Sequence, residues 1–227
     1  MASDYLFDEE RHRRLGLEEA VLCAHKSVAQ IAAAIDDARQ QGRRRLFTRL
    51  EPKQHGELDE TDRGGLDYDP LSQTAILGGS MAPPTPARVA VVTAGTSDKW
   101  IAAEATRTLA YHGEAAALFQ DLGVAGLWRL LRHEAEIAAH PAVIAIAGME
   151  GALFSVLAGL VPSAIIAVPS ATGSGVASGG RVALGSALAS CAPGLTVVNI
   201  DNGYGAACAA LRLLRQIDRA VSAAGAG

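Results

Sequence analysis

Five apolar runs of strand length alternate with helix-length segments over the second part of the chain. The runs are RVAVVT (88–93), EAAALF (114–119), AVIAIA (142–147), AIIAV (164–168) and TVVNI (196–200). Strands that are apolar throughout need cover on both faces, and a helix between each pair makes neighbouring strands parallel. The pattern therefore predicts an α/β fold, a flavodoxin-like three-layer α/β/α domain with a five-stranded parallel sheet.

The connecting segments predict five helices, at about 98–111, 125–139, 151–159, 180–190 and 205–222. Gly113 follows the first of them in the position where glycine commonly ends a helix.

The N-terminal part is richer in charge, since residues 1–70 hold 26 of the 44 charged side chains. Ser27 can cap a helix that runs to about Gln41, and residues 46–50 and 74–77 are strand candidates. The Gly/Pro-rich segment 78–86 is typical of a linker. We expect a small α/β domain over 1–87, followed by the larger domain over 88–227.

Composition excludes several classes of function. A net charge of −4 and a pI near 5.9 disfavour binding to nucleic acid or anionic membranes. The long uncharged run 151–180 is broken by Pro162, Pro169 and glycines, so it does not suit a membrane helix. The three cysteines form no C-x-x-C pair, and with no evident signal peptide we expect a reduced, cytoplasmic setting.

Two reactive side chains stand out in a charge-poor region. Between Pro141 and Ile200 only Glu150 and Arg181 are charged. A carboxylate in apolar surroundings usually has a partner or a role, although Glu150 could also be a helix-terminus charge. Cys191 lies in SCAPG between a helix end and a strand, and it could also be an ordinary buried cysteine. Cys23 and Cys208 are typical of packing residues.

Three loops are candidate ligand sites. TAGTSD (93–98) joins the first strand to a helix and could cradle a phosphate on backbone N–H groups, or simply cap the helix. Asp201 and Asn202 form a turn or reach toward a ribose or a metal ion. The loop 169–180 fits a dinucleotide fingerprint poorly, because residues 169–172 intervene after the strand. Its glycines instead predict a mobile loop that closes over a ligand.

Residues 88–214 resemble the aminoimidazole ribonucleotide carboxylase fold, and more closely the LarB family of pyridinium-3,5-biscarboxylic acid mononucleotide synthases. The resemblance rests on VVTAGTSD, AGMEGAL, SCAPG and VVNIDNGYGAA, and it extends to 11–21, Lys26-Ser27 and DYDPLSQTAILG (67–78). The chain departs from the family at Ser174 and Ser178, where aromatic residues are usual, and at Gln73, where arginine is usual. These departures bear on the pyridine substrate more than on the chemistry.

The resemblance implies carboxylation of nicotinic acid adenine dinucleotide by CO2 at ring carbon 5, with release of AMP, for biosynthesis of a nickel-pincer cofactor. Cys191 would be the nucleophile and Glu150 the base. It further implies a divalent ion, magnesium, with Asp98 or Asp201 as ligands, no organic cofactor, and a homo-octamer. The substrate-binding residues that it implies are Gly95, Thr96, Ser97, Asp98, Gly148, Met149, Gly173, Gly175, Asp201 and Asn202.

Two other functions compete. An aminoimidazole ribonucleotide carboxylase or mutase of purine biosynthesis would need a histidine after the third strand, where this chain has Glu150 and no histidine follows Pro141. A non-catalytic nucleotide-binding relative would not need Cys191 or Glu150.

Overall fold

The computed structural model describes residues 7–8, 10–79 and 86–225, which divide into two compact units, 1–81 and 82–227. Most of the linker expected at 78–86 lies outside the described residues. No helix in the described ranges is long and apolar enough to cross a membrane.

Unit 1 is built on a mixed four-stranded sheet in the order β1-β2-β4-β3. Its strands are β1 (Val21–Leu22), β2 (Arg45–Thr48), β3 (Leu66–Asp69) and β4 (Thr74–Leu77). Its helices are α1 (Arg11–Leu15), α2 (Val28–Gln40), α3 (Pro52–Glu57) and α4 (Glu60–Gly64). Ile31 and Ile35 of α2 share a fully buried core with Phe47 of β2. Ser27 caps α2 as expected, accepting the N–H of Gln30 at 3.2 Å.

Unit 2 contains the five-stranded, all-parallel sheet that the sequence predicts, in the order β6-β5-β7-β8-β9. The strands are β5 (Val89–Thr93), β6 (Ala116–Phe119), β7 (Ala142–Ala147), β8 (Ala164–Pro169) and β9 (Thr196–Val197). The order confirms the flavodoxin-like topology. The last strand is shorter than expected, because the N–H of Ile200 is bonded to the side chain of Asn199 rather than to a neighbouring strand.

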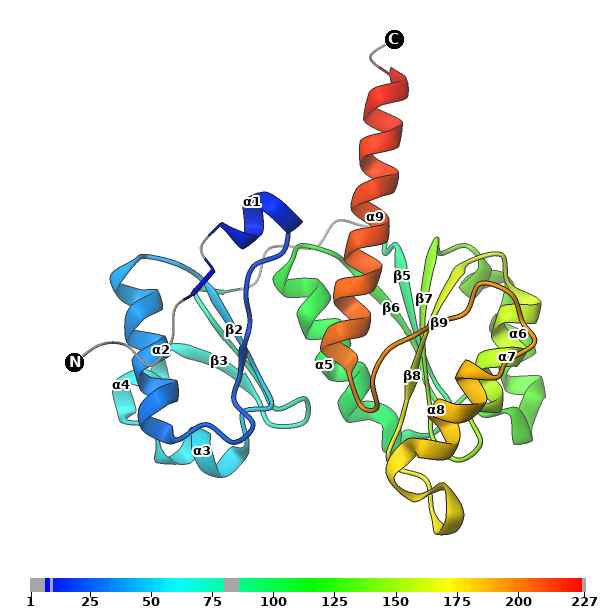
Figure 1. The fold of residues 1–227 in the computed structure, drawn as a ribbon, viewed down its shortest axis with the longest axis horizontal. Coiled ribbons are helices and arrows are strands. Elements are labelled where there is room, and N and C mark those ends of the chain that lie inside the picture. Colours follow the sequence, from blue (N-terminus) through cyan, green and yellow to red (C-terminus); the bar gives the residue numbers. More distant parts are fainter. Residues whose placement is uncertain (1–6, 9, 80–85, 226–227) are drawn as a thin grey trace. The chain divides into compact units, whose positions relative to one another are not determined.

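Helices cover both faces of this sheet (Figure 1). On one face lie α5 (Lys99–Tyr111) and α9 (Gly203–Gly225), and on the other α6 (Leu127–Ala138), α7 (Ala152–Leu160) and α8 (Arg181–Leu188). Short 3-10 turns η1 (Thr96–Asp98), η2 (Val124–Gly126) and η3 (Gly175–Gly180) interrupt three loops. All residues of β5 and β7 are buried, which explains their continuous apolar sequence.

The central strands β5 and β7 connect to helices on opposite faces of the sheet, and ligands of such folds bind where the direction of connection reverses. The carboxyl ends of β5 and β7 are therefore the place where the fold itself favours a site.

Candidate active site

A cavity of about 440 Å³ lies at the carboxyl ends of the central strands. Its walls come from the loops after four strands and from helix α6: Gly95, Ser97 and Asp98 after β5, Gly123 after β6 with Arg129 in the first turn of α6, Gly148, Met149 and Glu150 after β7, and Thr172 after β8. Six of the residues predicted from sequence thus share one cavity. Thr96, Gly173, Gly175, Asp201, Asn202 and Cys191 are not among the residues that line it.

Asp98 connects two of these loops. Its side chain is buried, with one carboxylate oxygen accepting the N–H of Gly95 at 3.1 Å and the other the hydroxyl of Thr172 at 2.9 Å. The side chain makes no capping bond to α5. Ser97 and Thr96 are exposed beside it. The loop therefore presents the Thr96 and Ser97 hydroxyls beside a buried carboxylate whose two oxygens both accept hydrogen bonds.

Glu150 stands in a tight turn before α7. The turn is closed by a bond from the N–H of Gly151 to the carbonyl of Gly148 at 2.9 Å, and both Met149 and Gly151 have left-handed backbones. A Cβ on Gly151 would lie 2.8 Å from the ring of Phe154, so glycine is required there. The Glu150 side chain is exposed and borders the cavity, so a water-accessible carboxylate lines the same cavity as Gly95, Ser97 and Asp98.

Arg129 is the functional candidate that sequence reasoning missed. Among the described residues that line the cavity it is the one cationic side chain, and it is ion-paired with Asp121 in the loop after β6. A Cβ on Gly126 would lie 2.8 Å from the Arg129 Nε, so glycine at 126 leaves room for the guanidinium. The signal was present in DLGVAGLWR (121–129), where an acid, two glycines and an arginine follow the second strand.

Asp201 and Asn202 have structural partners. Asp201 accepts the N–H of Ala171 at 2.8 Å, and its own N–H donates to the carbonyl of Pro169 at 2.8 Å. Asn202 accepts the N–H of Gly205 at 2.7 Å in the first turn of α9. Asp201 therefore stabilises the start of the loop after β8, and Asn202 the first turn of α9. Neither residue lines the cavity.

The described residues contain no group of three or more His, Cys, Asp or Glu side chains that could hold a metal ion. Asp98 and Asp201, the two carboxylates expected as magnesium ligands, each accept hydrogen bonds from the loop after β8. This donor set does not fit a dedicated magnesium site.

Cys191 lies apart from Glu150. The turn that carries it follows α8 and leads into the amino end of β9, whereas Glu150 leaves the carboxyl end of β7. Its neighbour Ser190 shares a hydrogen bond of 2.7 Å with Ser155 of α7. The Cys191 side chain is exposed, so it is not the buried cysteine of the alternative interpretation. Within one subunit, the two expected catalytic residues do not share the cavity.

The other cysteines differ in their surroundings. Cys23 is fully buried, and burial raises the pKa of its thiol to about 12. Cys208 is half-buried in α9.

Two comparisons with known proteins give matches. Residues 5–78 match the model of the LarB/PurE-like N-terminal domain family. An uncharacterized protein, MJ0165, of Methanocaldococcus jannaschii is 43% identical over 121 residues, which cover 52% of this chain and 46% of the relative. The chain thus matches about half the length of this curated relative.

Proposed function

We propose, for a chain whose residues 5–78 match the model of the LarB/PurE-like N-terminal domain family, that the cavity of unit 2 carboxylates the pyridinium ring of nicotinic acid adenine dinucleotide. The domain match confirms the resemblance to the LarB family and supports an enzyme of the carboxylase or mutase type. The substrate, the reaction and the roles of individual residues are our proposal.

One observation carries the proposal: the Glu150 carboxylate borders the same cavity as the loop Gly95–Asp98. A phosphate held by the loop would bring the rest of the nucleotide within reach of a base. Arg129, in the first turn of α6, adds a cation to the cavity wall, where it can pair with a phosphate or with the ring carboxylate. Its ion pair with Asp121 would fix the guanidinium before the substrate arrives.

The chemistry needs a nucleophile and a base. Ring carbon 5 of a pyridinium becomes nucleophilic only after an addition elsewhere on the ring, which the thiolate of Cys191 would supply by forming a C–S bond. Carbon 5 of the resulting enamine then attacks CO2 and forms a C–C bond. Glu150 removes the carbon 5 proton, the C–S bond breaks, and the ring regains aromaticity as the thiolate leaves. Water cleaves the phosphoanhydride and releases AMP. We assign no step to a metal ion.

Because Cys191 and Glu150 do not share a cavity in one subunit, the mechanism requires the Cys191 turn of a second copy. The turn is exposed, and Leu188 before it is 69% exposed, an apolar side chain that a subunit contact would cover. A closed homo-oligomer, the octamer that the resemblance implies, would present each cavity with a neighbour's thiol.

The test is incubation of the protein with nicotinic acid adenine dinucleotide and ¹³C-bicarbonate, followed by mass spectrometry. We expect a mononucleotide that carries one labelled carboxyl group, together with AMP. Labelled product from aminoimidazole ribonucleotide alone would instead support the purine-pathway carboxylase. Nucleotide binding without product from either substrate would support the non-catalytic relative.

A further inference from the structure

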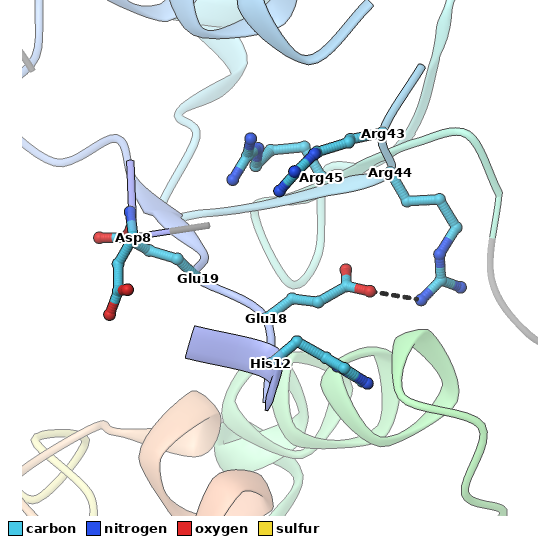
Figure 2. A pocket seen from close by; sticks show the side chains of 7 residues that line it. All are labelled: Asp8, His12, Glu18, Glu19, Arg43, Arg44 and Arg45. Atoms are coloured by element: carbon cyan, nitrogen blue, oxygen red, sulfur yellow. Dashed lines mark hydrogen bonds and ion pairs between the residues drawn. The ribbon is translucent and has the colours of Figure 1, made fainter. Parts of the chain in front are cut away.

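Unit 1 contains a polar cavity of about 350 Å³ that the proposed function does not use. Its lining comprises the arginine run 43–45, three carboxylates and His12 (Figure 2). A lining with so many charged groups is unlike a packing defect, because such defects are lined by apolar side chains.

The three consecutive arginines do not act alike. Arg44 turns toward Glu18 and its Nη2 lies 3.4 Å from that carboxylate, whereas Arg43 and Arg45 extend together to the other side (Figure 2). This division follows from the alternation of side chains along an extended backbone entering β2. It brings two guanidinium groups to the same side of the strand.

Arg45 is the unusual member. It is only 6% exposed, and its guanidinium carbon lies 3.7 Å from the centre of the Phe7 ring. Its Nε and Nη2 are buried and make no hydrogen bond within the described residues. The carboxylate of Asp37 comes to 3.8 Å from Nη2, which is an ion pair beyond hydrogen-bond range. Burying guanidinium donors without acceptors is costly, so the site favours an added acceptor.

The carboxylates of the lining already have partners. Asp8 accepts both terminal nitrogens of Arg14, at 2.8 and 2.5 Å, and this pairing lowers the pKa of Asp8 below its usual range. Glu19 accepts the N–H of Asp8 at 2.8 Å and lies 3.8 Å from Arg11. Their charges are thus matched inside unit 1, so they oppose an incoming anion less than their number suggests.

We propose that this cavity binds the phosphate group of a small phosphorylated metabolite, with Arg45 and Arg43 as its principal donors. A planar guanidinium fork matches two oxygens of an oxyanion, and two arginines on one side suit the several oxygens of a phosphate monoester. Binding would supply Arg45 with acceptors that the described residues do not provide. A ligand with a carboxylate group could pair with the same two guanidinium groups but has fewer oxygens, so a carboxylate is the competing ligand.

Hydrogen–deuterium exchange of the full chain locates the binding, with inorganic phosphate as the probe and chloride at equal ionic strength as the reference. We expect phosphate to slow exchange in peptides that span 10–19 and 43–48. The same protection should persist in Arg129→Ala, because that substitution affects only the cavity of unit 2. Absence of protection in these peptides would refute the proposal without touching the proposed carboxylation.

Substitutions identify the donors. Arg45→Gln should weaken phosphate binding in unit 1 at least tenfold, as loss of a charge-assisted hydrogen bond predicts. Arg13→Gln is the matched control, since the Arg13 side chain is 82% exposed and paired with Glu10. If circular dichroism shows Arg45→Gln to be unfolded, Arg43→Gln replaces it with the same expectation. Unchanged affinity in a folded variant, or equal protection by acetate, would overturn the assignment.

Discussion

Thr172 donates its hydroxyl hydrogen to Asp98 at 2.9 Å, across 74 residues of sequence, and so joins the loop after β8 to the loop after β5. The Ser170 hydroxyl lies 2.9 Å from the Thr172 oxygen and extends the connection back to the end of β8. Two loops that border one cavity are therefore held by a short chain of hydroxyls ending on a buried carboxylate.

Thr172→Val removes this donor and keeps the shape of the side chain. We expect a loss of about 1–3 kcal/mol in the free energy of unfolding, because the buried Asp98 carboxylate loses one acceptor bond. Urea denaturation followed by circular dichroism measures it. Thr172→Ser, which retains the hydroxyl, is the control and should cost less. A larger loss in Thr172→Ser than in Thr172→Val would show that the methyl group, not the hydrogen bond, matters.

Glu150→Gln keeps size and hydrogen bonding but cannot take a proton. Turnover in the labelled-bicarbonate assay should fall by about 10²–10⁴, as expected for the loss of a general base. Thermal unfolding should stay close to that of the parent protein, because the side chain is exposed. A lower melting temperature with unchanged activity per folded molecule would instead identify Glu150 as a helix-terminus charge.

Cys191→Ala should abolish carboxylation and leave the fold intact. If each active cavity takes its thiol from a second copy, co-refolding Cys191→Ala with Glu150→Gln should restore activity, to about a quarter of the parent level for random mixing of subunits in pairs. Neither variant alone regains activity on the same treatment. Failure of the mixture, when light scattering shows mixed oligomers, would contradict the shared site.

The three cysteines should differ in reactivity toward iodoacetamide. The pKa of Cys23 is raised to about 12 by burial, so its thiolate is scarce below that pH and its labelling near pH 8 should be very slow. In the dissociated subunit Cys191 is exposed and should be modified first. Peptide mass spectrometry at successive times gives the order. Protection of Cys191 in the oligomer and its exposure on dilution would add support for a subunit contact at this turn.

Arg129→Ala should weaken binding of the dinucleotide at least tenfold, because it removes the cation that borders the cavity. Arg129→Lys keeps the charge but not the planar fork and should give an intermediate affinity. Calorimetry measures both, and Arg132→Ala on the same helix, whose guanidinium lies over Trp128, is the control. Parent-like affinity in Arg129→Ala would place the phosphates elsewhere.

The sequence predicted unit 2 closely because its central strands β5 and β7 are buried on both faces, and a strand buried on both faces has a continuous apolar sequence such as AVIAIA. It missed β3, whose sequence LDYD is polar. That strand lies at the edge of its sheet, where Asp67 is exposed and only one neighbour, β4, pairs with it. Edge strands carry little apolar pattern, so the hairpin with β4 becomes visible only in three dimensions.

The candidate site was predicted in part for a similar reason. Glu150 and Asp98 follow parallel strands, so sequence order alone brings them to one edge of the sheet. Arg129 was missed because its position depends on the side chain of Asp121 and on space left by Gly126. Cys191 was predicted between a helix and the next strand, and in a parallel sheet such a connection leads to the opposite edge from a strand-to-helix loop. The separation of Cys191 from Glu150 could therefore have been predicted from the order of helices and strands in the sequence.

The start of the loop after β8 is held twice, by Asp98 through Thr172 and by Asp201 through Ala171. Residues beyond Thr172 carry no such double restraint, and Gly175 and Gly179 have no atom within 4 Å of an added Cβ. The exposed side chains at 174, 176 and 178 can change without moving the cavity wall at Thr172. Glycine is required at 173 and 180, because an added Cβ would lie 2.5 Å from the Ala177 carbonyl oxygen and 2.8 Å from Ile200. Ser174 and Ser178 are two of these exposed positions, so relatives can differ there while the start of the loop keeps its place beside the cavity.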